Sequence, residues 1–105
     1  MSDGLKFYLV ENDHTDEACP TQTEDGLRLV EDIVEGKEHA ARSGVAVLAF
    51  YVAVGTHRSL TFLAAENIQN GQQYAEPFRK LGPTTVTEII RGETLIHDAL
   101  KEYKH

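Results

Sequence analysis

The feature that most constrains the fold is a run of ten consecutive apolar residues at positions 45–54, Val-Ala-Val-Leu-Ala-Phe-Tyr-Val-Ala-Val. The run is too short to cross a bilayer and is rich in β-branched and aromatic residues, so it predicts a β-strand. Strict alternation divides its large side chains between two faces: Val45, Val47 and Tyr51, then Leu48, Phe50, Val52 and Val54. Both faces are apolar, so the fold must cover both of them.

Three further segments have the composition of strands, and glycine and proline residues separate them from their neighbours. Residues 5–10 predict a first strand, which runs into a long polar loop at 11–23. Residues 59–65 predict a strand that forms an antiparallel hairpin with 45–54 through a turn at 55–58. Residues 84–90 predict the fourth strand.

Helical spacing of apolar residues appears in three places. The first helix follows a capping-box pair, Thr21 and Glu24, and is loosened at Gly36 before a left-handed cap at Gly44. The second contains Tyr74, Phe78 and Leu81, with a bend or late start at Pro77, and Asn67 and Asn70 are expected to cap it. The third is a short amphipathic helix defined by Ile96, Ala99, Leu100 and Tyr103.

The order strand, helix, strand, strand, helix, strand, with a terminal helix, is the split βαβ order of ferredoxin-like α+β folds. A chain of 105 residues has room for one domain, spanning 1–105. Two helices cover one face of such a sheet, and a second copy packed sheet to sheet would cover the other. The sequence therefore predicts a homodimer in which the central strands, 45–54 and 59–65, face the partner.

The charge balance excludes some classes of partner. Seventeen acidic residues against ten basic ones give a formal net charge of -7, which repels nucleic acid and anionic membranes. The N-terminus lacks the basic start and apolar stretch of a signal peptide, and the single cysteine, Cys19, cannot form an intrachain disulfide. We therefore expect a cytoplasmic protein with neither a nucleic acid nor a membrane as partner.

The element order, the length and the doubly apolar strand resemble the dimeric α+β barrel superfamily, which includes antibiotic-biosynthesis-type monooxygenases, muconolactone isomerase-like proteins and small nickel-binding proteins. Within it, the opening segment 7–20 resembles a largely uncharacterised group whose first strand runs into a His-x-His followed by a Cys-Pro. Further likeness lies in Gly55-Thr56-His57 and in the segment 75–78, Ala-Glu-Pro-Phe. This chain departs from the group at Asn12, which stands in place of the first histidine.

The predicted topology brings together residues with metal-binding chemistry. The end of the first strand and the turn of the hairpin lie at one edge of the sheet, so His14 and His57 should share a site with Cys19 close by. The carboxylates of Asp13, Asp16 and Glu17 are near in sequence. Two imidazoles, a thiol and carboxylates form a mixed donor set suited to Ni, Zn or Cu.

Other residues admit both a structural and a functional interpretation. Tyr8, Phe50 and Phe62 belong to the sheet, where they serve either the core and the dimer interface or a ligand pocket between sheet and helices. The remaining histidines, His39, His97 and His105, are expected at the solvated surface.

Two classes of function remain open at this level, besides a purely structural dimer. The first is a binding protein that holds a divalent transition metal or a small ligand through His14, His57 and Cys19. The second, which the resemblance implies, is an oxygenase or isomerase of the antibiotic-biosynthesis monooxygenase type, with His14 or His57 as general base. The sequence leaves open whether the protein is an enzyme, since folds of this kind host many chemistries.

Overall fold

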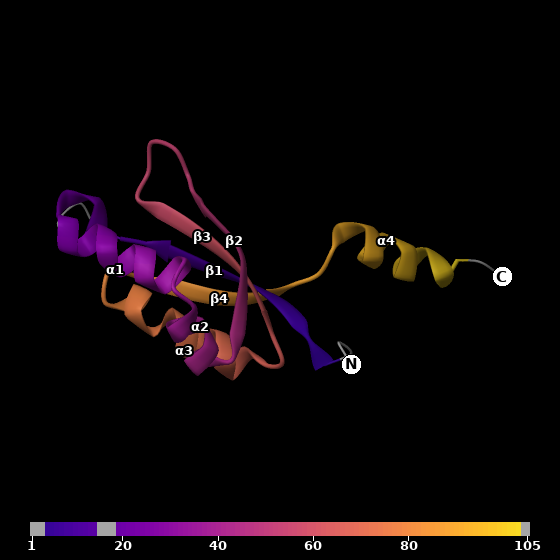
Figure 1. The fold of residues 1–105 in the computed structure, drawn as a ribbon. Helices are drawn as coiled ribbons and strands as arrows, with labels where there is room; N and C mark the ends of the chain where they lie inside the picture. The colour runs from indigo at the N-terminus through magenta and orange to yellow at the C-terminus, as the bar shows by residue number, and fades with distance from the viewer. Residues whose placement is uncertain (1–3, 15–18, 104–105) are drawn as a thin grey trace.

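The computed structural model describes residues 4–14 and 19–103 as a four-stranded antiparallel sheet with the first three helices on one side and a terminal helix beyond the sheet. The strands are β1 (Lys6–Asp13), β2 (Val45–Val52), β3 (Arg58–Ala65) and β4 (Thr84–Ile89), in the spatial order β2-β3-β1-β4. The helices are α1 (Glu24–Val34), α2 (Lys37–Ser43), α3 (Ile68–Arg79) and α4 (Gly92–Lys101), with a 3-10 turn, η2, at Pro20–Gln22. This is the ferredoxin-like α+β arrangement (Figure 1).

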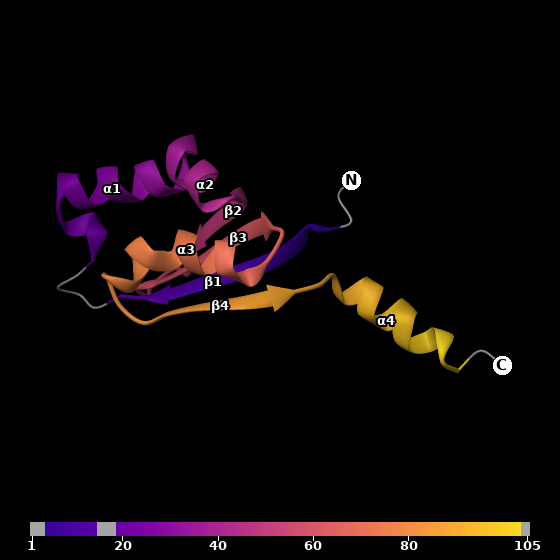
Figure 2. The same ribbon diagram turned by 90° about the horizontal axis from the view of Figure 1, so that it is seen from below.

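The covered face of the sheet holds the core. Along β1, Tyr8, Val10 and Asn12 are each only 1% exposed, and their register partners on β3 include Leu63 and Thr61. Helix α3 packs directly on β1 and β3, and its Tyr74, Ala75 and Phe78 are buried against them. Figure 2 shows α1, α2 and α3 on this side of the sheet.

The long apolar strand β2 lies at the edge of the sheet, so its predicted central position is wrong. Between Val47 and Ala49 the pairing with β3 shifts by one residue, as a β-bulge at Leu48 produces. A shift of one residue exchanges the faces of every later side chain. Phe50 and Val52 therefore join Val47 on the covered face, and Tyr51 turns to the open face, contrary to the alternation expected from the sequence.

Helix boundaries follow local chemistry, with two differences from expectation. The N-cap of α1 is Thr23, whose hydroxyl accepts from the Gly26 N–H, in place of the predicted pair at Thr21. Helix α3 begins after its predicted cap, Asn67, and continues through Pro77 in its last turns, so it does not start late at Pro77 as one of the two predicted alternatives had it. Gly44 closes α2 with a φ of 73°, a left-handed conformation that favours glycine.

The connection from α3 to β4 is pressed against the end of β1. The Asp13 N–H donates to the Pro83 carbonyl over 3.0 Å, and a Cβ atom at Gly82 would collide with the Asp13 carbonyl oxygen. A glycine is thus required at position 82 by close backbone approach. This contact fixes the end of β1, and with it the residues that follow, relative to α3.

The terminal helix α4 projects away from the sheet, as Figures 1 and 2 show. None of its residues is buried, and its apolar side chains are more than half exposed, among them Leu95, Ile96 and Leu100. The face of the sheet opposite the helices is also exposed at Phe7 and Tyr51. Within the described ranges, no helix is long and apolar enough to cross a membrane.

Candidate metal centre

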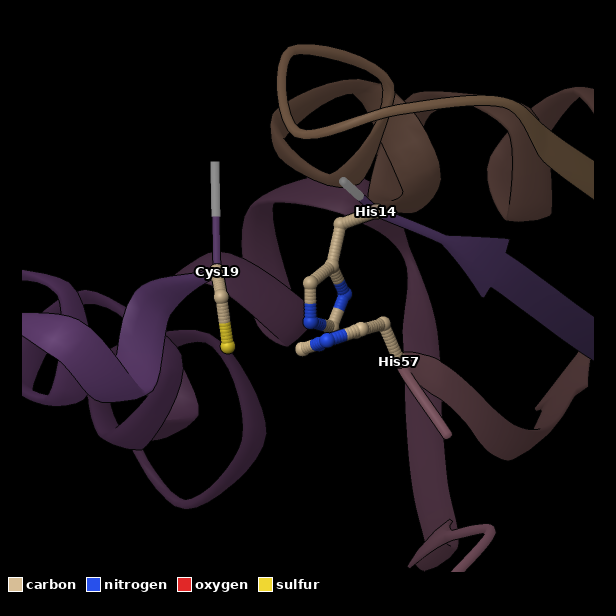
Figure 3. A group of neighbouring side chains, drawn as sticks. All are labelled: His14, Cys19 and His57. Atoms are coloured by element: carbon tan, nitrogen blue, oxygen red, sulfur yellow. The ribbon is translucent and has the colours of Figure 1, made fainter. Parts of the chain in front are cut away.

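The end of β1 and the β2–β3 turn meet at one end of the sheet, as the topology predicts. Asp13 pairs with Arg58 in the β1–β3 register, and just beyond them the His14 N–H donates to the His57 carbonyl over 3.2 Å. Two histidines far apart in the sequence are thereby joined through their backbones. Figure 3 shows the rings of His14 and His57 with the sulfur of Cys19 beside them.

The three side chains form a compact donor cluster. The ring centroids of His14 and His57 lie 5.2 Å apart in an edge-to-face arrangement with an interplanar angle of 68°. One donor atom from each of the two histidines and Cys19 falls within 4.8 Å of the others. Cys19 is buried, His14 is half-buried and His57 is exposed. The cluster therefore lies at the boundary between the interior and solvent.

His14 is held by the side chain of Asn12. Its Nδ1 lies 3.1 Å from the Asn12 Oδ1, and the Asn12 amide is itself bound to the end of α3 and the start of β4. Asn12 occupies a covered-face position of β1, in line with Tyr8 and Val10. The orientation of the His14 ring is thus coupled to three elements of the fold.

The electrostatic setting lowers the proton affinity of both kinds of donor. Burial is the main cause of the lowered pKa of His14; the neighbouring His57 lowers it further, and Asp13 opposes both. The pKa of Cys19 is lowered chiefly by hydrogen bonding to Thr21, whose hydroxyl lies 2.9 Å from the sulfur, with a smaller contribution from His57. Both shifts favour the deprotonated forms, which are the forms that bind metals.

The predicted carboxylates do not join the cluster where the structure describes them. Asp13 forms a two-point ion pair with Arg58, with nitrogen–oxygen distances of 3.0 and 3.1 Å. The Asp13 carboxylate is thus paired with the Arg58 guanidinium on β3. Its effect on His14 is the electrostatic one on the His14 pKa. Asp16 and Glu17, the other two predicted carboxylates, lie outside the described residues.

A cavity of about 320 Å³ lies beside the cluster, between the covered face of the sheet and the helices. Its apolar walls come from α1, β2 and the α3 end, through Leu27, Val30, Phe50, Val52, Phe78 and Leu81. The lining also includes the polar residues Asn12, His14, Cys19, Thr21, Thr56, His57 and Ser59. The volume lies at the lower end of the range for small-molecule sites.

The three residues predicted to bind a ligand separate in the structure. Phe50 lines the cavity. Tyr8 is sealed in the core, 1% exposed, against α3. Phe62 pairs with Leu9 on the open face and lies edge-to-face with Tyr51 at 6.1 Å, so neither it nor Tyr8 lines this cavity. The β-bulge, which the sequence does not mark with a glycine, decides the position of Phe50.

The other histidines also separate. His97 is exposed on α4, as expected. His39, expected at the surface, is half-buried, and its Nε2 lies 2.9 Å from the Tyr74 carbonyl oxygen, with the two rings 4.9 Å apart. His105 lies outside the described residues.

Sequence reasoning missed Asn12 as a contributor to the site, because it treated this position as a departure from a histidine pair. The predicted first strand also ended at residue 10, whereas β1 continues to Asp13. Extending the alternation of Tyr8 and Val10 to Asn12 is the signal that would have assigned a polar amide to the buried face. Such a residue must find hydrogen-bond partners in the interior. The pocket-lining residues of α1, Leu27 and Val30, carried no signal beyond ordinary helical spacing.

Comparison with known proteins supports the fold and leaves the chemistry open. No protein-family model matches the chain, and no curated protein matches it in sequence. Among solved structures, it is similar to a NipSnap family protein of unknown function from Agrobacterium tumefaciens. The two share 13% sequence identity over 84% of this chain and 90% of the other, with a TM-score of 0.50. This likeness extends to the fold alone.

Proposed function

We propose that the protein binds a divalent transition metal ion through His14, His57 and Cys19. The observation that carries the proposal is the convergence of two imidazoles and one thiol, with donor atoms within 4.8 Å of one another, from two segments distant in sequence. A mixed nitrogen and sulfur donor set suits Zn, Ni or Cu better than it suits Mg or Ca.

The geometry requires a small contraction to hold one ion. With metal–nitrogen and metal–sulfur bonds of about 2.0 and 2.3 Å, donors around a tetrahedral ion lie about 3.3 to 3.6 Å apart. Rotation of exposed His57 at the hairpin turn supplies the simplest closure. His14 and Cys19 are held by Asn12 and Thr21 and would provide the fixed side of the site.

Three protein donors leave one position of a tetrahedral ion open. In zinc enzymes that position holds water or substrate, whereas structural sites use four protein ligands. Here the apolar cavity adjoins the cluster. The arrangement therefore favours a site where the ion meets a small, largely apolar molecule.

The test is equilibrium binding of Zn²⁺ and of Ni²⁺ to metal-free protein purified without a histidine tag. We expect one ion per chain, and a loss of roughly 100-fold or more in affinity for His14→Ala, His57→Ala and Cys19→Ser, since even outer-sphere changes cost 10- to 100-fold. His97→Ala, on α4, is the matched control and should bind as the wild type does. Equal affinities in all five proteins would refute the proposal.

The cavity favours a second candidate function, an oxygenase or isomerase acting on a small aromatic compound with His14 or His57 as general base. The supporting observation is an apolar chamber of about 320 Å³ beside an imidazole whose pKa is lowered by burial. Such an imidazole is neutral, and so able to accept a proton, at neutral pH. This candidate predicts that His14→Ala or His57→Ala abolishes turnover in protein stripped of metal.

We also propose that the protein is a homodimer joined through the open face of its sheet. Support comes from the exposed aromatic side chains of that face, Phe7 at 44% and Tyr51 at 61%, and from the unpaired apolar side of α4. A second copy presents the same face and so matches it in chemistry and extent.

A further inference from the structure

The surroundings of Asn12 determine which way its buried amide points. Its Nδ2 lies 2.9 Å from the Phe78 carbonyl oxygen, 2.9 Å from the Thr84 hydroxyl and 3.4 Å from the Gly82 carbonyl oxygen. Carbonyl oxygens only accept hydrogen bonds, so the amino group must face them. Turning the amide over would place Oδ1 against two carbonyl oxygens in a site only 1% exposed.

The hydroxyl of Thr84 agrees with this orientation. It donates its hydrogen to the Gly82 carbonyl over 3.0 Å, which leaves its lone pairs for the Asn12 amino group. Donors and acceptors around the amide are therefore matched in one arrangement. An assignment of amide oxygen and nitrogen rests on such a network, and here the network is unambiguous.

The orientation of Asn12 fixes the proton of His14. Because Oδ1 accepts only, the ring nitrogen 3.1 Å from it, Nδ1, must carry a hydrogen. A neutral imidazole has a single N–H, so its lone pair then lies on Nε2. Histidine in water favours the opposite tautomer, and the protein must therefore supply the preference.

We infer that Asn12 is a positioning residue that holds neutral His14 in the Nδ1–H tautomer and so presents Nε2 as the metal-binding atom. The metal-binding part of this inference rests on the proposed function; the tautomer does not. Metal-bound histidines commonly donate their second N–H to a carboxylate or carbonyl partner, which orients the ring. Here an amide supplies the acceptor without adding a negative charge to the site.

His39 provides an internal control, because its surroundings favour the opposite tautomer, Nε2–H. Its Nε2 lies 2.9 Å from the Tyr74 carbonyl oxygen, an acceptor only, so neutral His39 must carry its hydrogen on Nε2. The structure thus assigns opposite tautomers to two histidines of one chain. A single spectrum can test both assignments under identical conditions.

The experiment is two-bond ¹H–¹⁵N correlation NMR of the metal-free, ¹⁵N-labelled full chain at a pH where both rings are neutral. We expect a protonated Nδ1 and an unprotonated Nε2 for His14, and the reverse for His39. Finding His14 as the Nε2–H tautomer in the wild type would overturn the inference without any variant.

Substitutions then separate positioning from mere support of the fold. In Asn12→Leu, which keeps the size and removes the acceptor, His14 should shift toward the Nε2–H tautomer, His39 should not change, and Zn²⁺ affinity should fall roughly 10- to 100-fold. Asn12→Asp restores an acceptor beside Nδ1, while its second oxygen faces the Phe78 and Gly82 carbonyls and must carry a proton there; in that form the variant should restore the Nδ1–H tautomer. A folded Asn12→Leu protein with an unchanged His14 tautomer would overturn the inference.

The two proposals fail in different ways. Wild-type protein with the Nδ1–H tautomer and no Zn²⁺ binding would refute the proposed function and leave the role of Asn12 intact. Zn²⁺ binding by a wild-type protein whose His14 is the Nε2–H tautomer would refute the role of Asn12 and leave the proposed function intact. If Asn12→Leu does not fold, Thr84→Val removes an acceptor of the Asn12 amino group and should loosen the same tautomer preference.

Discussion

The two faces of the sheet are built from similar apolar side chains and end in opposite environments. On the covered face, Tyr8 and Leu63 are at most 1% exposed, whereas on the open face Phe7 and Tyr51 keep 44% and 61% of their accessible surface. The difference arises because α1, α2 and α3 all lie on one side (Figure 2). Burial in this protein is therefore decided by where the helices lie and less by how apolar each strand residue is.

The β-bulge at Leu48 decides which side chains of β2 meet which environment. After it, Phe50 and Val52 face the cavity beside the candidate metal centre, and Tyr51 faces outward. Without the extra residue these assignments would be reversed. The covered face of β2 thus lines the cavity, and its open face belongs to the proposed dimer interface. Substitutions of neighbouring residues on β2 can therefore test the two faces separately.

The largest expected effect comes from placing a charge on each face of β2. Val47→Asp places a carboxylate at a half-buried position packed against the core and should destabilise the fold by several kcal/mol. Tyr51→Asp should leave the chain folded, as judged by circular dichroism, and dissociate the proposed dimer, as judged by sedimentation. A wild-type protein that sediments at 11.7 kDa at micromolar concentration would contradict the dimer.

A smaller effect is expected from shortening leucines on opposite faces of β3. Leu63 is 0% exposed, so Leu63→Ala should lower the unfolding free energy of the protein by about 2 to 5 kcal/mol through lost contacts and a cavity. Leu60→Ala, on the open face of the same strand, should cost clearly less, because Leu60 is only half-buried. Urea denaturation of both variants measures the difference, and equal losses would mean that the open face is covered as fully as the other.

The N-cap of α1 stabilises one of the helices that lie on the covered side of the sheet. Thr23→Ala removes the acceptor of the Gly26 N–H and should cost about 1 kcal/mol of unfolding free energy. Glu24→Ala, one residue later, removes only an exposed ion pair with Arg28 and should cost about 0.3 to 0.5 kcal/mol. Thermal denaturation of both variants gives the order, and a larger loss for Glu24→Ala would argue against Thr23 as the cap.

The smallest expected effect is a pH dependence of the unfolding free energy that arises from His14, at the end of β1. Burial lowers the pKa of His14 in the folded state, so the folded protein binds this proton less readily than the unfolded chain, whose histidine pKa is about 6.5. Stability is therefore complete above pH 6.5 and declines as the pH falls through the lowered value. In metal-free protein, His14→Gln should reduce this decline between pH 7 and 5; an unchanged profile would exclude His14 as its source.

Much of the fold was predictable because its signals are local. The strands, the cap at Asn67 and the left-handed turn at Gly44 each follow from residues within a few positions, and their order implies the ferredoxin-like topology. The same topology brought His14 beside His57, since an antiparallel pairing of β1 with β3 leaves the end of one strand next to the start of the other. Metal binding by these residues stays a prediction.

What the sequence by itself determined is which segments form strands and helices and which end of the sheet carries the histidines and Cys19, because periodicity, caps and chain order encode these. Tertiary structure alone decided the faces of Phe50 and Tyr51, the burial of His39 and the role of Asn12. Each of these depends on partners distant along the chain: a one-residue register shift against β3, the Tyr74 carbonyl, and the carbonyls of Phe78 and Gly82. A buried polar group takes its orientation from whichever acceptors packing brings to it, and packing is a property of the folded chain.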